Sequence, residues 1–239
     1  HIVSAGRERG YWPALACIVA AIVVAIGVQA VRARGRQHSA DSVAVRDYAT
    51  APGERATLTL GDGTRITIAP VSHLRLTFDP ARRATEARLE GEAVFAVRHD
   101  AGRQFVVRTA RAVTRDLGTT FGVRDYPADE VARVVVRDGS VALASLSAST
   151  GNPTTTLTSG ELGEIGGDGR LRPVQRVRAG SYLGWADGAI TFDGTPLREA
   201  LPELARWYDL DVRLSDSSLG GRRVTASFTT ESATQALRI

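Results

Sequence analysis

Alternation of apolar and polar residues along most of the chain is the feature that most restricts its fold. Between Arg46 and Val174 apolar residues recur at every second position, and turn residues interrupt the pattern at short intervals. Such alternation is typical of β-strands with one buried face, because successive side chains of a strand point to opposite faces. The sequence therefore predicts an all-β domain over residues 46–175, with a twisted, solenoid-like or sandwich-like arrangement of strands.

Two glycine-containing turns indicate where strands reverse direction. Gly61-Asp62-Gly63 and Asp138-Gly139 both lie between segments of alternating apolar residues. Asp-Gly in this setting is typical of β-hairpins, because the turn types that it permits match the twist of paired strands. We therefore expect a hairpin at each turn.

From about Gly184 the pattern changes to that of a small α+β domain with a β-α-β order. Ala189–Phe192 predicts a strand, and Thr195 and Pro196 suit the N-cap and first residue of the helix that follows. Pro202 lies one turn into this helix, where we expect a bend. The helix carries one apolar stripe, formed by Leu197, Ala200, Leu201, Leu204, Ala205 and Tyr208.

The α+β domain is expected to span residues 185–239 and to be truncated at its C-terminal end. Asp211–Leu214 and Val224–Phe228 predict two further strands, and a second helix is expected from about Ser232. An exposed strand edge can accept a strand from another chain. A candidate partner-binding edge is therefore formed by Val224, Thr225, Ala226, Ser227 and Phe228. The alternative is that further residues of the same chain cover this edge.

An apolar run, Trp12–Val31, contains a single polar residue, Gln29. About 20 apolar residues are the length that crosses a bilayer as a helix. The sequence therefore predicts a transmembrane helix over residues 11–31, with residues 1–10 as a cytoplasmic remnant and residues 32–45 as a tether. A signal peptide is the alternative, but the run is longer than the apolar region of a typical signal peptide, and no clear cleavage pattern precedes Arg32.

Arginine is the only basic residue type apart from histidine, and the formal net charge of the chain is +4. The arginines are dispersed among acidic residues rather than gathered on one face, so we expect a solvated surface and no nucleic-acid binding. The single cysteine, Cys17, lies in the apolar run and has no partner for a disulfide within the chain.

Residues for conventional catalysis or metal binding form no recognisable pattern. Glu90 and Glu92 share one strand face, where turn and rim positions are much more common than an acid–base pair. We therefore predict no enzyme activity, no metal and no cofactor. None of the histidines has a metal-ligand spacing: His1, His38, His73 and His99.

Gly118-Thr119, within the stretch DLGTTFGVRD, can be interpreted in two ways. In the first, Gly118 supplies a backbone bend, and Thr119 and Thr120 open a β-strand in which Phe121 is buried. In the second, the Thr119 hydroxyl attacks the Gly118 carbonyl, shifts the acyl group from nitrogen to oxygen, and hydrolysis of the ester splits the chain. Both interpretations stay open at this point.

Three segments, in this order, carry a resemblance to a known family: LGDGTRITIAPVSHLRL, LEGEAVFAVRHDAGRQFVV and DLGTTFGVR. The chain resembles the FecR family of membrane-anchored anti-sigma regulators. WADGAITFDGTPLREALPELARWYDLDV is similar to the short secretin/TonB N-terminal domain that follows the FecR domain in those proteins. The resemblance covers most of the chain from Glu54 onward.

The resemblance implies a relay across two membranes of a bacterial cell. The signalling domain of an outer-membrane TonB-dependent receptor, typically one for an iron chelate, contacts the C-terminal part of the regulator. A cytoplasmic domain before His1 binds an extracytoplasmic-function sigma factor, and membrane proteases cleave the regulator. The family orientation places Arg32 onward in the periplasm, although the local arginine count leans the other way.

The leading hypothesis is thus a single-pass inner-membrane anti-sigma regulator with no enzymatic turnover. An alternative of a different class is a membrane-anchored periplasmic structural or glycan-binding β module, because all-β domains also serve such roles.

Overall fold

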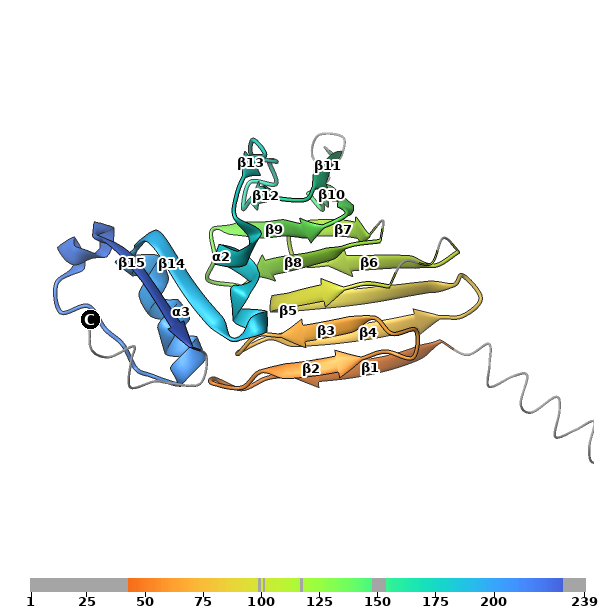
Figure 1. Ribbon diagram of the computed structural model, residues 1–239, viewed down its shortest axis with the longest axis horizontal. Coiled ribbons are helices and arrows are strands. Elements are labelled where there is room, and N and C mark those ends of the chain that lie inside the picture. The colour runs from red at the N-terminus through yellow and green to blue at the C-terminus, as the bar shows by residue number, and fades with distance from the viewer. Residues whose placement is uncertain (1–42, 99, 101, 117, 148–153, 230–239) are drawn as a thin grey trace, which may run out of the picture. The chain divides into compact units, whose positions relative to one another are not determined.

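The structure, a computed structural model, describes residues 43–98, 100, 102–116, 118–147 and 154–229. Residues 44–239 form one compact unit, and the account below concerns its described part (Figure 1). The transmembrane helix predicted for residues 11–31, the remnant before it and most of the tether lie outside the described residues. None of the helices within the ranges given above is both long and apolar enough to cross a bilayer.

The β-domain consists of 13 strands in the described part of the chain, all joined in one sheet, so a mainly β fold is confirmed. They are β1 (Ala44–Ala49), β2 (Ala56–Thr59), β3 (Arg65–Ile68), β4 (His73–Asp79), β5 (Ala84–Ala96), β6 (Gln104–Arg108), β7 (Ala112–Asp116), β8 (Thr120–Asp125), β9 (Val131–Asp138), β10 (Ser140–Ser145), β11 (Thr154–Thr158), β12 (Glu161–Gly166) and β13 (Gln175–Arg176).

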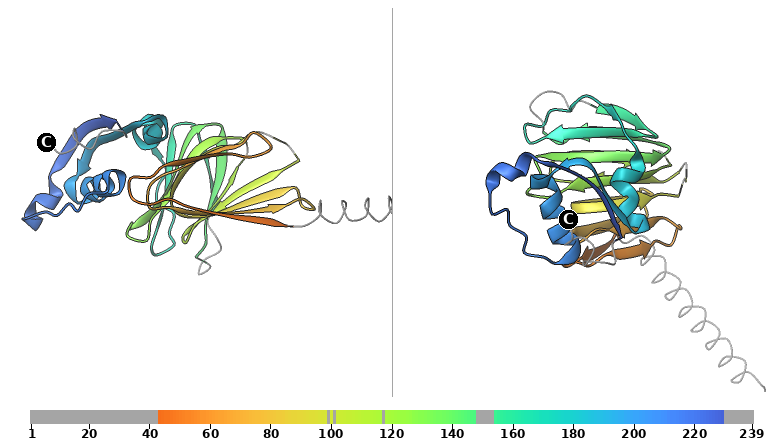
Figure 2. Two further views of the ribbon diagram at one scale, coloured as in Figure 1. Left: turned by 90° about the horizontal axis from the view of Figure 1, so that it is seen from below. Right: turned by 60° about the vertical axis from the view of Figure 1, so that its left-hand side comes forward.

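The sheet is folded into two layers by β5, which belongs to both. Its first half pairs with β4 and, in parallel, with β6, whereas its second half pairs with β3 and β8. The first layer therefore also contains β1, β7, β10 and β11, and the second also contains β2, β9, β12 and β13. The change of partners falls between Glu90 and Gly91, and Gly91 has a φ of 111°. Figure 2 shows the curled sheet from two further directions.

The main core lies between the two layers. The ring of Phe95, in the second layer, lies 5.7 Å from that of Phe105 in the first layer and 5.3 Å from that of its neighbour Phe121. In β4 the buried residues Leu74 and Leu76 alternate with exposed ones. The apolar half of the sequence alternation thus faces the interior, as in other two-layer β folds.

Glycines with positive φ mark three places where the chain crosses between the layers. Gly118 lies between β7 and β8, Gly139 between β9 and β10, and Gly160 between β11 and β12, with φ values of 98°, 87° and 79°. The first two crossings touch, because Thr119 Oγ1 donates a hydrogen bond to Ser140 O over 2.5 Å. The regular succession of crossings gives the two-layer domain a solenoid-like character.

The hairpin predictions have different outcomes. The hairpin at Gly61–Gly63 is confirmed, because β2 and β3 pair in antiparallel with Leu58 opposite Ile66. The hairpin predicted at Asp138-Gly139 is wrong: β9 pairs with β8 and β12, whereas β10 pairs with β7 and β11. A glycine with positive φ serves a crossing between layers as well as a hairpin turn, so the local sequence does not distinguish them.

Residues 179–229, the C-terminal segment, contain helices and a separate two-stranded antiparallel sheet, β14-β15. Its elements are α2 (Ala179–Leu183), η2 (Gly184–Asp187), β14 (Ala189–Pro196), α3 (Leu197–Tyr208), η3 (Ser217–Gly221) and β15 (Arg223–Thr229).

The predicted elements of this segment are largely confirmed, with two corrections. The strand over Ala189–Phe192 continues to Pro196, because Thr195 pairs with Val224 of β15; Pro196, and not Thr195, is therefore the N-cap of α3. Asp211–Leu214 is not a strand, because no described strand pairs with it. The second helix, predicted from Ser232, lies outside the described residues.

The apolar side of α3 packs into a second core. Ala200, Leu204 and Trp207 are its buried residues, and the helix continues through Pro202. Trp207 was not part of the predicted stripe, although it lies three residues after Leu204 on the same side of the helix. The second core also includes residues from the outer face of the second layer: Ala69, Val94, Val135 and Leu162. The C-terminal segment is therefore built onto the β-domain.

Gly122, in β8, packs against Leu183 of α2. A Cβ atom at this position would lie 2.2 Å from Cδ2 of Leu183, which is buried. We predict that Gly122→Ala lowers the free energy of unfolding by roughly 1–3 kcal/mol, the usual cost of overpacking. Urea denaturation of this variant and of the control Gly61→Ala, whose Cβ would meet nothing within 4 Å, measures the effect. Equal stability of the two variants would contradict the tight packing of Leu183 on β8.

Candidate functional site

The predicted Gly118–Thr119 site lies at the first crossing between the layers. Thr119 is 3% exposed, and its hydroxyl donates to Ser140 O, while Gly118 N donates to Asp116 Oδ2 over 2.9 Å. A Cβ atom on Gly139 would lie 2.6 Å from Gly118 O, so the second crossing packs directly against this peptide group. The Gly118–Thr119 peptide is therefore held from two sides.

The predicted binding edge, Val224–Phe228, forms most of β15, which pairs with β14 only among the described strands. Phe228 is buried in the second core, and Val224 and Ala226 pack against it from partly buried positions. Thr225 and Ser227 are exposed and point away from that core. Backbone groups and these two small polar side chains are therefore what the edge can offer to a partner.

Few of the residues considered for catalysis or metal binding fall in the part of the chain that the structure describes. His73 lies on the outer face of the first layer, whereas His1, Cys17, His38 and His99 lie outside the described residues. Among the residues that the structure describes, no three His, Cys, Asp or Glu side chains could jointly hold a metal ion.

Glu90 and Glu92 do not form a pair on one face, because β5 changes layers between them. Glu90 is exposed, but Glu92 is buried at 7% exposure, so the interpretation of Glu92 as a rim carboxylate is wrong. The sequence does carry one signal for this burial. Glu92 lies directly before the apolar run Ala93–Val97, and a charge that is buried among apolar residues needs partners. Those partners belong to a site that the sequence analysis missed.

This site, which we call the clasp, consists of Glu92, Arg124, Asp129, Trp185 and Glu203. Glu92 and Arg124 are direct neighbours across β5 and β8, and Asp129 follows in the turn after β8. Trp185 comes from η2 and Glu203 from α3. The clasp therefore joins the β-domain to the C-terminal segment through polar side chains.

Arg124 is the centre of the clasp. Its Nη1 donates to Glu92 Oε2 over 3.2 Å and to Glu203 Oε2 over 3.0 Å, and its Nε donates to Asp129 Oδ2 over 2.9 Å. Trp185 Nε1 donates to the other oxygen of Glu92 over 2.8 Å. Because charged groups are costly to bury without partners, these bonds hold α3 and η2 in one position on the β-domain.

A second set of contacts surrounds Tyr126, next to the clasp. The guanidinium groups of Arg206 and Arg124 lie 4.2 Å and 5.1 Å from the centre of the Tyr126 ring. The Tyr126 hydroxyl donates to Pro70 O over 2.8 Å, and Gly53 N donates to Arg206 O over 2.8 Å. The C-terminal half of α3 is thus attached to the β-domain by stacked cations and by a backbone hydrogen bond.

The ionisation of the clasp depends on Glu92. Burial raises the pKa of the Glu92 carboxyl to about 7, with Arg124 opposing this rise and Glu203 adding to it. For Arg124, burial alone would lower the pKa, but Glu203, Glu92 and Asp129 outweigh it and raise the pKa. Arg124 therefore stays charged, and Glu92 is the group of the clasp that gains a proton near neutral pH.

We predict that Glu92 makes the protein more stable at mildly acidic pH. The carboxyl titrates near 4.5 when unfolded and at about 7 when folded, so the folded protein binds more protons between these values. The free energy of unfolding should therefore fall by up to roughly 3 kcal/mol as pH rises through this range. Glu92→Gln should remove this component, because an amide does not titrate. Urea denaturation at several pH values, with Glu90→Gln as the exposed control, measures it; identical pH profiles for wild type and Glu92→Gln would contradict the assignment.

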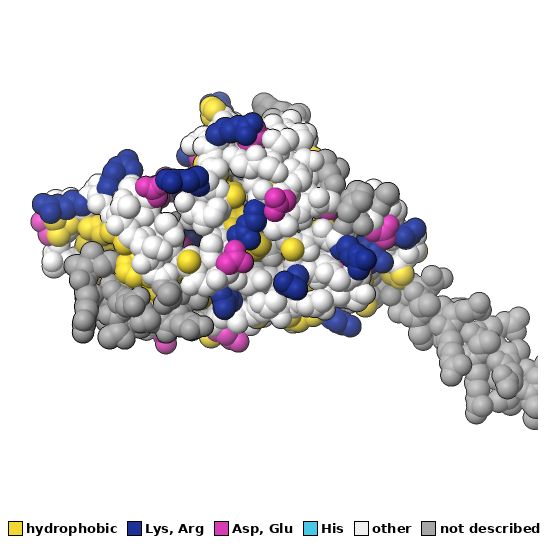
Figure 3. Space-filling model, in the orientation of Figure 1, with side chains coloured by type: hydrophobic (Ala, Val, Ile, Leu, Met, Phe, Trp, Pro, Cys, Tyr) yellow, Lys and Arg dark blue, Asp and Glu magenta, His cyan; other side chains and the backbone are white. Residues whose placement is uncertain are grey.

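Basic and acidic side chains are interspersed on the face displayed in Figure 3, as the sequence indicates. Several exposed arginines pair with acids of neighbouring strands or turns, for example Arg103 with Asp62 and Arg178 with Asp193, both over 2.9 Å. The surface thus carries many local ion pairs, each of small energetic value.

Comparison with known proteins gives consistent matches for both parts of the chain. The family model described as FecR protein matches residues 46–142, and the model described as FecR, C-terminal, matches residues 189–239. The first range runs from within β1 to within β10 of the β-domain, and the second contains the β14–β15 region. No curated protein sequence matches the chain significantly.

Two crystal structures of a candidate anti-sigma factor from Parabacteroides distasonis ATCC 8503 are similar to this chain. The structure at 2.50 Å resolution has a TM-score of 0.71 and 25% sequence identity, and the match covers 81% of this chain and 89% of that chain. The structure at 1.65 Å resolution has the same TM-score and identity, with coverages of 80% and 88%. The fold of most of this chain is therefore similar to that of these solved structures.

Proposed function

Since the chain belongs to the FecR family of anti-sigma factors, we propose that this sigma-factor regulator works as a relay at the bacterial inner membrane. In this proposal the chain spans the membrane once, through residues 11–31, with the β-domain and the C-terminal segment in the periplasm. A domain preceding His1 holds an extracytoplasmic-function sigma factor. The signalling domain of a TonB-dependent receptor, one related to iron uptake, binds the C-terminal segment, and membrane proteases cleave the regulator.

The clasp is the observation that carries this proposal. A receptor that binds the C-terminal segment can influence the rest of the chain only through the contacts of that segment with the β-domain. Three of the five clasp side chains, Glu92, Arg124 and Asp129, belong to the β-domain, and Glu203 lies on α3 beside the β14–β15 sheet. A network whose carboxylates share one guanidinium changes as a unit when one member moves.

We predict that Glu203→Gln weakens the response of sigma-dependent transcription to the receptor. The substitution removes the charge by which α3 holds Arg124, while Glu92 and Asp129 keep Arg124 paired. The measurement is a promoter reporter in cells that contain the complete regulator, its sigma factor and its receptor, with and without the receptor ligand. The induced change in reporter activity should be several-fold smaller than in wild type.

Glu199→Gln is the matched control, because Glu199 also lies on α3 and pairs with an arginine of the β-domain, Arg133, but at 3.7 Å and with a 46% exposed side chain. This variant should respond as wild type does. An unchanged response of Glu203→Gln would contradict the relay through the clasp, and failure of the complete protein to bind any sigma factor would contradict the wider proposal.

We also propose that the Gly118–Thr119 bond is a site of self-cleavage. Three features support this proposal. Gly118 has a positive φ, and it has no side chain that would hinder attack on its carbonyl carbon. The Thr119 hydroxyl, the attacking group, is held by a hydrogen bond. Attack of Oγ1 on the Gly118 carbonyl carbon forms an ester and breaks the amide bond, and the hydroxyl proton passes to the nitrogen of Thr119. Water then hydrolyses the ester and restores the hydroxyl.

We predict that freshly folded protein divides into fragments 1–118 and 119–239, and that Thr119→Ala remains whole because it lacks the nucleophile. Denaturing gels over a time course, with fragment masses determined by mass spectrometry, give the answer. Ser140→Ala is the control, because it retains the backbone carbonyl that accepts the Thr119 hydrogen bond. A wild-type protein that stays intact through prolonged incubation would leave Gly118 with a purely structural role.

A further inference from the structure

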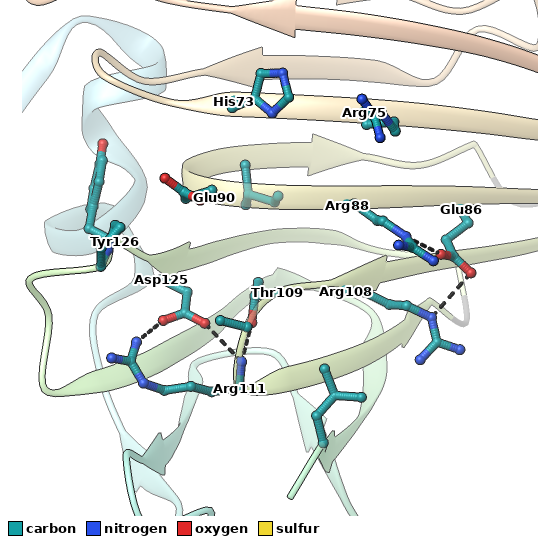
Figure 4. Close-up of a pocket in the computed structure, with 14 residues that line it drawn as sticks. His73, Arg75, Glu86, Arg88, Glu90, Arg108, Thr109, Arg111, Asp125 and Tyr126 are labelled. Atoms are coloured by element: carbon teal, nitrogen blue, oxygen red, sulfur yellow. Dashed lines mark hydrogen bonds and ion pairs between the residues drawn. The ribbon is translucent and has the colours of Figure 1, made fainter.

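Three arginines form a row across the outer face of the first layer. Arg75 of β4 lies directly opposite Arg88 of β5, and Arg88 lies directly opposite Arg108 of β6. Neighbouring strands are about 4.8 Å apart, so three cationic side chains follow one another at this spacing on one face. Figure 4 shows them on adjacent strands of the same groove. We call Arg75, Arg88 and Arg108 the arginine row.

Such a row is unfavourable for folding, because like charges directly opposite each other destabilise paired strands. Two carboxylates offset part of the repulsion. Asp47 accepts from Nε of Arg75 over 2.7 Å, and Glu86 accepts from Nε of Arg88 over 3.0 Å and from Nε of Arg108 over 3.1 Å. Three cations thus share two anions.

The hydrogen-bonding groups of the arginine row are only partly used. All three bonds to carboxylates go through Nε, and both Nη atoms of each guanidinium lack a hydrogen-bond partner within the described part of the chain. The side chains of Arg75, Arg88 and Arg108 are 51%, 68% and 35% exposed. Paired Nη donors fit the two oxygens of a carboxylate, which makes arginine well suited to bind one.

The row is part of a groove with a volume of about 850 Å³. Beyond the row, the groove is lined by His73, Glu90 and Tyr126 and by two exposed apolar residues, Pro127 and Leu146. Arg111 also lines the groove but is paired with the buried carboxylate of Asp125. The groove therefore offers unused Nη donors of the arginine row together with exposed apolar side chains.

We propose that this groove binds an acidic peptide segment of a partner protein, with carboxylates on the arginine row and an apolar residue against Leu146 and Pro127. Charge complementarity favours an acidic occupant, and the presence of exposed apolar side chains beside the cationic ones favours a peptide over a small inorganic anion. The groove is lined mostly by residues of the first layer, together with Asp125 and Tyr126 at the end of β8, and it includes none of the five clasp residues. Failure of this proposal would therefore leave the proposed relay untouched.

The test uses the complete chain in a nonionic detergent and a fluorescent pentaglutamyl-leucine peptide as the probe, measured by anisotropy. Wild-type protein should bind the probe, and binding should weaken as salt rises from about 0.05 to about 0.5 M, because the contacts are between exposed charges. Arg88→Gln should weaken binding by about tenfold, the loss expected for one charge-assisted pair. Its midpoint of urea denaturation should be equal to or above that of wild type, because the substitution relieves repulsion in the row.

Arg115→Gln is the matched control, because Arg115 is an exposed arginine of β7 in the same layer that lies outside the row and the groove. It should bind the probe as wild type does. Equal losses in both variants, or no loss in Arg88→Gln, would overturn the proposal. Binding to vesicles containing phosphatidylglycerol in place of the peptide would overturn it as well, since it would identify a lipid surface as the occupant. Arg75→Gln and Arg108→Gln repeat the test should Arg88→Gln fail to fold.

Discussion

The passage of β5 from the first layer to the second at Gly91 positions both the core and the polar sites. Glycine is required at this position for two reasons. A Cβ atom on Gly91 would lie 2.3 Å from Ser72 Oγ and 2.8 Å from Ser72 Cα, and the φ of 111° is one that other residues rarely adopt. The close approach of the two backbones allows Ser72 Oγ to accept a hydrogen bond from Glu92 N over 3.0 Å. Through this bend, one strand lines the groove of the arginine row with Glu90 and supplies the clasp with Glu92. A straight β5 would have placed both carboxylates on the same surface.

The clasp is better understood as a positioning device than as a source of stability. Burying several charges costs free energy that their mutual attraction only partly returns, so an apolar contact of the same size would hold the C-terminal segment at least as firmly. The apolar part of the interface supplies the attraction: Trp185 and Trp207 of the C-terminal segment lie in one buried cluster with Val94, Val135 and Leu162 of the β-domain. The charges add directionality, because Arg124 must face Glu203 of α3 while Trp185 reaches Glu92. Because these hydrogen bonds depend on direction, a small displacement of α3 would alter them. Such a contact suits a relay better than a purely apolar contact, which tolerates small displacements.

The sequence predicts the parts of this molecule that depend on local periodicity. The alternation between Arg46 and Val174 corresponds to strands that share a core, and the stripe containing Leu204 corresponds to the buried side of α3. Prediction from the sequence fails where pairing between residues far apart in the chain determines the structure. Asp138-Gly139 has the sequence of a hairpin but joins strands of different layers, and Asp211–Leu214 has the pattern of a strand but no described partner. The clasp was missed for the same reason, since Glu92 and Glu203 are brought together only by the docking of α3.

β8 connects two of the places where this chain is proposed to act, the Gly118–Thr119 crossing and the clasp. Thr119 immediately precedes the strand, Arg124 is its second-to-last residue, and Phe121 is buried between them in the main core. The register of β8 against β5 places Phe121 opposite Phe95 and Arg124 opposite Glu92, so the crossing and the clasp are fixed by one ladder of backbone hydrogen bonds. A displacement of Arg124 along the strand would have to break this ladder and the packing of Phe121 before it altered the crossing. Side-chain rearrangement within the clasp is therefore a less costly response to a force on the C-terminal segment than a shift of β8 along β5.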